Sequence, residues 1–153
     1  MKYIKESRSA AETAALAGQI SGAASAGSIF CLDGDLGAGK TVFAQGFARG
    51  LGIEGPVSSP TFTILHIYNS GRLPLYHFDV YRLASPEEMY DLGYEDYFFG
   101  DGISIVEWGS SMRALFPEET VFIEIEKDLV KGDDYRRITI SCEHPLKALE
   151  RIL

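Results

Sequence analysis

The stretch Gly34-Asp35-Leu36-Gly37-Ala38-Gly39-Lys40-Thr41 decides the fold of this chain. It has the form G-x-x-x-x-G-K-T, the pattern of a P-loop that holds the phosphates of a nucleotide. A mostly apolar run over residues 28–32 precedes it and is typical of a buried strand. Apolar residues at helical spacing follow it, and Gly50 and Gly52 close that run. We therefore predict a strand, a phosphate-binding loop and a helix, one directly after another.

The chemistry of phosphate binding explains these residue types. Backbone N–H groups can surround a phosphate only where the chain comes very close to it, and glycine permits this because it has no Cβ. The helix that follows directs its N-terminal N–H groups and the positive end of its dipole at the anion. In this arrangement Lys40 reaches the β- and γ-phosphates, and the Thr41 hydroxyl ligates Mg²⁺. The alternative is a glycine-rich turn with a chance Lys-Thr, which the flanking strand and helix disfavour.

Length and charge limit the possible classes of protein. A chain of 153 residues predicts a single domain over residues 1–153, large enough for a real core. The net charge of −8 argues against a protein that binds nucleic acid directly, without a partner, because such binding needs clustered Lys and Arg. If nucleic acid is involved, a partner should bring it.

Cysteine usage and hydropathy indicate the compartment. Cys31 falls in the predicted core strand, and neither it nor Cys142 belongs to a C-x-x-C pair. Buried free thiols are therefore favoured over a disulfide, which fits a reducing cytoplasm. Residues 1–6 lack an apolar signal core, and no window approaches the roughly 18 apolar residues of a membrane span. We expect a cytoplasmic protein with no membrane partner.

The remaining pattern predicts an α/β protein with a P-loop NTPase-like, three-layer fold. Ser9 and Glu12 have the spacing of a capping box that starts a helix. The β-rich runs 63–68 and 73–81 flank a short turn, so they predict an antiparallel hairpin and hence a mixed central sheet. Further strands are expected at 3–4, 103–107, 121–125 and 135–141, and further helices at 85–92, where Ser85 is the expected cap, and 145–152. The aromatic stretch 94–99 is either the edge of the core or a partner surface.

Two predicted strands end in acids that could complete a P-loop site. Asp79 fits an Mg²⁺ ligand, directly or through water, and Glu107 fits a general base or a water-positioning residue. An acid in this place can also simply mark the strand leaving the core, but the P-loop favours function. Thr61 could close over the γ-phosphate, although a Thr after Pro in a turn needs no function. Trp108 packs near the nucleotide or fills the core.

The three histidines, His66, His77 and His144, lack metal-ligand spacing in the sequence. His66 and His77 fall in predicted strands. For both we expect hydrogen-bonded packing residues.

Four stretches together resemble the TsaE (YjeE) family of ATPases, which act in bacterial tRNA threonylcarbamoyladenosine synthesis. They are the P-loop over 33–41, the S-P-T-F element within 57–63, the F-D-x-Y-R element within 77–82 and the E-W pair within 105–108. They occur in the family's order and spacing, and the resemblance covers nearly the whole chain. The P-loop alone is shared by very many NTPases, whereas the other three elements are far more particular.

The resemblance implies a compact P-loop fold with a mixed sheet, and ATP hydrolysis with Mg²⁺. It also implies that the ATPase acts in a complex with TsaB and TsaD. There, TsaD transfers the threonylcarbamoyl group to adenosine 37 of tRNAs that read ANN codons, and the ATPase supports repeated turnover. An acidic ATPase would then reach tRNA through its partners and not by its own surface.

The resemblance also implies roles for individual residues. It assigns catalytic roles to Glu107, Lys40 and Thr61, and Mg²⁺ binding to Thr41, Asp79 and Glu107. Whether Glu107 is the general base or an Mg²⁺ ligand stays open. It assigns nucleotide binding to Trp108 and to the P-loop residues Asp35, Leu36, Gly37, Ala38, Gly39, Lys40 and Thr41. The chain departs from the family at Val42, where a second Thr is usual, and at 109–111, where an acid and a basic residue usually follow the E-W pair.

Two other functions remain open from the sequence. A small-molecule kinase of this fold usually has an arginine-bearing lid that excludes water, but residues 83–102 are acidic and contain no Arg or Lys. A non-hydrolysing module would instead use ATP to order a partner surface such as 94–99. Replacing Glu107 separates that module from an ATPase. We expect hydrolysis by the isolated chain to be slow, because partners would be needed to order the loop over 56–63.

Overall fold

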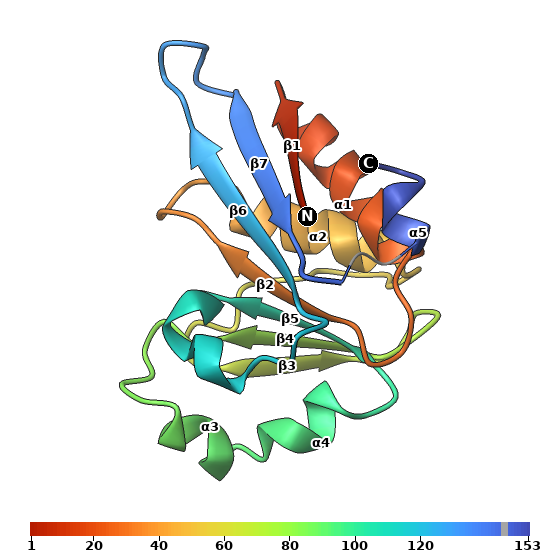
Figure 1. The fold of residues 1–153 in the computed structure, drawn as a ribbon, viewed down its shortest axis with the longest axis vertical. Helices are drawn as coiled ribbons and strands as arrows, with labels where there is room; N and C mark the ends of the chain where they lie inside the picture. Colours follow the sequence, from red (N-terminus) through yellow and green to blue (C-terminus); the bar gives the residue numbers. More distant parts are fainter. Residues whose placement is uncertain (145–146) are drawn as a thin grey trace.

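The protein is built on one seven-stranded sheet in the order β1-β7-β6-β2-β5-β4-β3, seen in a computed structural model that describes residues 1–144 and 147–153 (Figure 1). The strands are β1 (Lys2–Ser7), β2 (Ile29–Asp33), β3 (Leu65–Tyr68), β4 (Leu75–Asp79), β5 (Ile103–Glu107), β6 (Val121–Lys127) and β7 (Arg136–Ser141). The helices are α1 (Ala10–Gly22), α2 (Lys40–Gly50), α3 (Glu87–Asp91), α4 (Tyr94–Phe98), the 3-10 helix η1 (Gly109–Leu115) and α5 (Lys147–Glu150).

The sheet is mixed, as the sequence predicts. Its centre is parallel, since β2 pairs in parallel with β5 and β6, and β4 pairs in parallel with β5. Its margins are antiparallel: β3 pairs with β4 as the predicted hairpin, and β7 pairs with β6 and β1. The carboxyl ends of β2, β4, β5 and β6 therefore meet at one edge of the sheet, where ligands bind in open α/β sheets.

Helices cover both faces of the sheet, so the predicted three layers are confirmed. Helices α1 and α2 lie on one face, and α3 and α4 lie on the other (Figure 1). The buried strand β2 contributes side chains to the core on both faces of the sheet, because successive side chains of a strand point to opposite faces. Phe30 packs edge-on against Phe47 of α2, with ring centroids 5.0 Å apart, whereas Ile29 belongs to the cluster that contains Phe98 of α4.

Two strands are shorter than predicted, and both differences matter for the site. Residues 63 and 64, predicted as the start of a strand, belong instead to a turn over 61–64: Ile64 has a φ of 69°, and its N–H donates to the Pro60 carbonyl (2.7 Å). Strand β4 ends at Asp79 instead of Tyr81, because the Asp79 carboxylate accepts the Tyr81 N–H (3.0 Å) and turns the chain. Thr61 is thus placed on a turn at the edge where β4 ends.

The helical predictions hold in part. Ser9 caps α1 by accepting the Glu12 N–H (3.1 Å), as expected. The expected cap at Ser85 is wrong: α3 begins at Glu87, and the Glu88 carboxylate accepts the Ser85 N–H instead. The stretch 94–98 is the helix α4 and packs into the core, while Phe99 beyond it is exposed. For the predicted helix 145–152, residues 145–146 lie outside the described residues. Both cysteines, Cys31 and Cys142, are buried free thiols, as predicted.

Candidate functional site

The carboxyl edge of the parallel strands holds a pocket of about 450 Å³. Residues from the P-loop, the turn at 59–61 and the ends of β4 and β5 line it: Leu36, Gly37, Gly39, Lys40, Thr41, Val42, Ser59, Thr61, Asp79, Tyr81, Glu107 and Trp108. The remaining two predicted site residues, Asp35 and Ala38, line an adjacent cavity of about 300 Å³. The structure therefore gathers at one place the residues that the sequence singled out from four separate segments.

The P-loop has the backbone shape that its glycines predict. Gly39, directly before α2, has a φ of 112°, a conformation that side-chain-bearing residues rarely adopt. A Cβ at Gly34 would lie 2.6 Å from the carbonyl oxygen of Ile125 on β6, so any other residue would push the loop off its neighbouring strand. Since α2 begins at Lys40, the free N–H groups of its first turn face the pocket.

Lys40 is the buried cation of the pocket, with only 7% of its surface exposed. Its ammonium donates to the carbonyls of Gly34 and Asp35 and lies 3.7 Å from the centroid of the Trp108 ring. Burial lowers the pKa of the Lys40 ammonium, and the nearby charges of Glu107 and Asp79 oppose that shift. Trp108 could either pack near the nucleotide or fill the core, and its contact with Lys40 supports a place beside the P-loop.

Asp79 and Glu107 form the acidic side of the pocket. They are partners in the parallel register of β4 and β5, and both are almost fully buried. Ser59 Oγ lies 2.9 Å from Asp79 Oδ2 and 3.2 Å from Glu107 Oε2, and Thr61 Oγ1 lies 3.3 Å from Asp79 Oδ2. Ser59 has one proton, so it can donate to only one carboxylate at a time. Two carboxylates and two hydroxyls make an oxygen-only donor set, which suits a hard cation such as Mg²⁺.

His77 is a site residue that sequence reasoning missed. It is 1% exposed, and its Nε2 lies 2.7 Å from Glu107 Oε2. Because an ionised carboxylate only accepts, the imidazole N–H must donate, which fixes the position of that oxygen. A signal was present: His77 and Asp79 are two residues apart on one strand and so share a face. Ser59 was also missed as a site residue, although it lies inside the S-P-T-F element that carries the resemblance.

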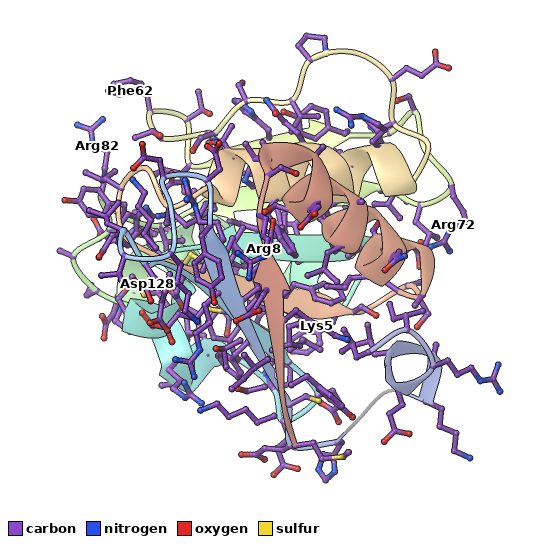
Figure 2. The ribbon with its side chains drawn as sticks, turned by 90° about the horizontal axis from the view of Figure 1, so that it is seen from above. Lys5, Arg8, Phe62, Arg72, Arg82 and Asp128 are labelled. Atoms are coloured by element: carbon purple, nitrogen blue, oxygen red, sulfur yellow. The ribbon has the colours of Figure 1, made fainter. Side chains whose placement is uncertain are left out.

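The mouth of the pocket carries exposed apolar side chains. Tyr81 lies against Trp108, with ring centroids 4.8 Å apart, and Leu36 is exposed on the P-loop. Phe62 is 85% exposed, and the guanidinium of Arg82 lies 5.3 Å from its ring centroid. Figure 2 shows Phe62 and Arg82 projecting together from one side of the molecule. The segments 61–62 and 81–82 therefore frame the entrance together.

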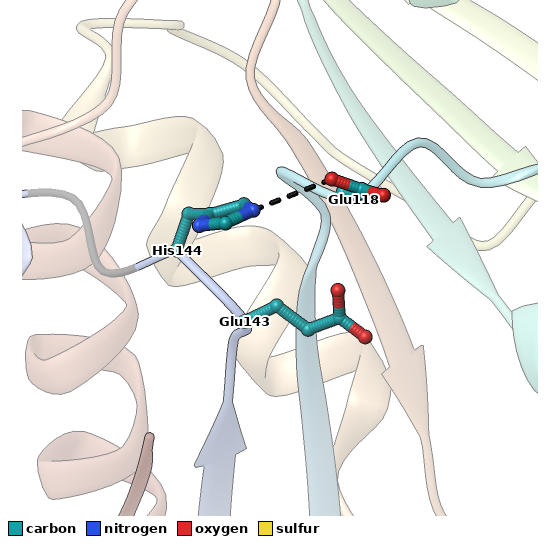
Figure 3. A group of neighbouring side chains, drawn as sticks. All are labelled: Glu118, Glu143 and His144. Atoms are coloured by element: carbon teal, nitrogen blue, oxygen red, sulfur yellow. Dashed lines mark hydrogen bonds and ion pairs between the residues drawn. The ribbon is translucent and has the colours of Figure 1, made fainter.

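One other cluster of potential ligands lies away from this pocket. In the described residues Glu118, Glu143 and His144 each offer an oxygen or nitrogen within 4.8 Å of the others (Figure 3). Glu118 precedes β6, and the other two residues follow β7, so the cluster lies at the edge of the sheet opposite the pocket. All three side chains are exposed, where a pair such as Glu118 and His144 (3.3 Å) contributes little to stability.

Among the helices that the structure describes, none combines the length and the apolar character needed to cross a membrane.

Comparisons with known proteins show the family. The sequence model of the family described as "Threonylcarbamoyl adenosine biosynthesis protein TsaE" matches residues 7–138. The chain is 48% identical over 130 residues to the tRNA threonylcarbamoyladenosine biosynthesis protein TsaE of Bacillus subtilis, covering 85% of this chain and 79% of that protein. It is 44% identical over 135 residues to the TsaE of Treponema pallidum, covering 88% of this chain and 97% of that protein.

A solved structure supports the same relationship. The crystal structure of Bacillus subtilis YdiB superposes with a TM-score of 0.81 at 40% sequence identity, and the match covers 94% of this chain and 87% of that one. Sequence and fold thus lead to the same relatives, and the resemblance seen in the four motifs is confirmed. This chain belongs to the TsaE family, whose members take part in tRNA threonylcarbamoyladenosine biosynthesis.

Proposed function

We propose that this chain is an Mg²⁺-dependent ATPase that acts with TsaB and TsaD in the threonylcarbamoylation of adenosine 37 in tRNAs that read ANN codons. Within the complex it supports repeated turnover, and tRNA is reached through the partners. The observation that carries the proposal is the single pocket that joins the P-loop residues Lys40 and Thr41 to the buried carboxylates Asp79 and Glu107.

Positioning and charge neutralisation are the means by which this pocket would act. The P-loop N–H groups and Lys40 hold the phosphates, and Trp108 restricts the Lys40 ammonium by lying against it. Thr41 and Asp79 would hold Mg²⁺, which would supply positive charge to offset that of the β- and γ-phosphates. Glu107, held by His77, accepts a proton from water or orients it for attack at the γ-phosphate.

The turn at 59–61 would account for the slow hydrolysis that we expect of the isolated chain. The hydroxyls of Ser59 and Thr61 bond the carboxylate of Asp79, and Ser59 also reaches that of Glu107. Both acids must exchange these contacts for Mg²⁺ and water before they can act. A partner surface that moves the turn would favour this exchange, and the exposed Phe62 beside it is available for such a contact.

A kinase is disfavoured by the position of the segment that would have to form its lid. Helices α3 and α4 lie within residues 83–102, and Met89, Tyr94 and Phe98 from these helices are buried in the core on the far face of the sheet. A segment held in this way cannot close over the P-loop. It also contains no Arg or Lys to stabilise the transferred phosphoryl group.

The proposal is tested by measuring phosphate release from ATP with Mg²⁺, by the chain alone and with TsaB, TsaD and substrate tRNA. We expect slow release by the chain alone, and stimulation when all three are added. Omitting Mg²⁺ should abolish release in both cases. If the chain binds nucleotide but hydrolyses it in none of these mixtures, the proposal is contradicted and a non-hydrolysing binding module remains.

Replacing His77 should lower the turnover rate more than substrate affinity. In His77→Ala the Glu107 carboxylate loses its buried donor, a charge-assisted hydrogen bond whose loss corresponds to a fall in kcat of about 10- to 100-fold. The KM for ATP should stay close to the wild-type value, because His77 does not line the phosphate pocket. In His77→Gln an amide N–H can replace the imidazole N–H, so part of the rate should return. Equal rates in the Ala and Gln variants would contradict a positioning role.

A further inference from the structure

The last rung of the β6–β7 ladder pairs two cations. Lys127 and Arg136 are cross-strand partners at the carboxyl end of β6. Like charges directly opposite each other on a sheet are destabilising, so this pairing costs free energy unless an anion offsets it. Within the described part of the chain, neither residue has a carboxylate oxygen within 4.0 Å of its charged nitrogens. These two positive charges therefore make no ion pair in the described residues, although the net charge of the chain is −8.

These two cations lie against the P-loop. Arg136 Nε donates to the Ala38 carbonyl (2.6 Å), and another guanidinium nitrogen donates to the carbonyls of Asp133 and Tyr135 (2.7 Å each). Lys127 is exposed, but a Cβ added at Gly37 would lie 3.3 Å from its Nζ. Arg136 therefore fastens the P-loop to the hairpin, while the Lys127 ammonium lies beside the middle of the loop.

The order of strands shows which end of a nucleotide this cationic pair would face. Strands β4 and β5, with Asp79 and Glu107, lie on one side of the P-loop strand β2, and β6 and β7 lie on the other. The acids and Lys40 act at the γ- and β-phosphates in the proposed mechanism. The other end of the phosphate chain then points toward the β6–β7 hairpin. Figure 2 shows Asp128, the neighbour of Lys127, on the same side of the molecule as Phe62 and Arg82. The end of β6 and the entrance of the phosphate pocket therefore lie at the same edge of the sheet.

The cavity next to Lys127 suits the rest of the nucleotide. It is about 300 Å³ in volume, and four acids contribute to its lining: Asp33, Asp35, Glu124 and Glu126. Carboxylates accept hydrogen bonds from hydroxyl and amino groups but repel phosphate. A ribose and a base therefore fit this cavity, and Lys127, which also lines it, stands at the boundary between its acids and the phosphate-binding loop.

We propose that Lys127 binds the α-phosphate of the nucleotide, as a second phosphate-binding lysine supplied by the β6–β7 hairpin. The assignment rests on the proposed binding of ATP. It explains why two like charges face each other at this rung, since an anion lying beside them would offset their repulsion.

The test compares ATP and ADP affinities of the wild type with those of Lys127→Met, followed by the fluorescence of Trp108, the single tryptophan, which lies in the phosphate pocket. The α-phosphate is common to both nucleotides, so Lys127→Met should weaken both by the same factor, about tenfold for one charge-assisted contact. Lys131→Met is the matched control on the same hairpin. Its ammonium faces Glu6 (3.4 Å) instead of the P-loop, so it should leave both affinities unchanged. The Tm of Lys127→Met should equal or exceed that of the wild type, because the like-charge pair is removed.

The outcomes separate this assignment from the proposed function. The assignment alone would be overturned if the wild type binds ATP and ADP and Lys127→Met binds each of them with the wild-type affinity. A variant weakened for ATP but not for ADP would place Lys127 at the γ-phosphate and overturn it as well. A variant weakened for ATP and ADP but not for AMP would place Lys127 at the β-phosphate and would also overturn it. Wild type that binds neither nucleotide would overturn the proposed function, and the assignment with it.

Discussion

Glu107→Gln is expected to bind ATP with nearly wild-type affinity and to hydrolyse it at least about 100-fold more slowly, because a positioned general base contributes 10²–10⁴ in rate. The substitution keeps the size of the side chain in a site where Glu107 is 2% exposed. A glutamine oxygen can still accept from His77 Nε2, so the packing and this hydrogen bond survive. What is lost is the negative charge that, in the proposed mechanism, accepts a proton from the attacking water.

The measurement is phosphate release in the TsaB, TsaD and tRNA mixture, together with ATP affinity from Trp108 fluorescence. Glu95→Gln removes the same charge from an exposed position on α4 and should retain the wild-type rate. Repeated tRNA modification should fail with Glu107→Gln, although ATP still binds. If modification continues at the wild-type rate while hydrolysis is lost, ATP acts only as a binding ligand and the ATPase proposal is wrong.

Local sequence was enough to predict the framework of this site. The P-loop motif, the apolar run of β2 and the helical spacing of α2 each depend on residues within one turn or strand of one another. Asp79 and Glu107 could be placed at one edge because the ends of parallel strands converge there, and the structure shows them as register partners. The hairpin β3–β4 followed from two β-rich runs and a short turn.

The contacts within the site could not be predicted, because they join segments distant in the chain. Ser59 meets Glu107 across 48 residues, and His77 meets it across 30. Thr63 and Ile64 were predicted as the start of a strand because both have strand propensity, whereas they lie in the turn at 61–64, where Ile64 adopts a positive φ. Lys127 and Arg136 become neighbours of the P-loop only once β6 lies beside β2.

Gly46→Ala is expected to lower the free energy of unfolding by about 2 kcal/mol, because overpacking a core contact typically costs 1–3 kcal/mol. The residue lies where α2 crosses α1, and a Cβ there would lie 2.4 Å from the Ala14 carbonyl oxygen and 2.6 Å from Ala14 Cα. Both are backbone atoms, so no side-chain rotation can relieve the clash and the helices must separate. Gly50, one turn later, meets Gly18 of α1 in the same way, with its added Cβ 2.5 Å from the Gly18 carbonyl oxygen.

Gly22→Ala is the matched control, since an added Cβ there meets nothing within 4 Å at the end of α1. Replacing a helical glycine that has free space should leave stability unchanged or raise it by up to about 1 kcal/mol, because alanine loses less backbone entropy on folding. Urea denaturation of both variants, followed by circular dichroism, measures the difference. Equal midpoints would mean that the two helices do not lie this close together. The result also bears on the proposed function, because α2 begins at Lys40. A helix displaced from α1 carries the proposed phosphate-binding lysine with it, so Gly46→Ala should weaken ATP binding while Gly22→Ala should not.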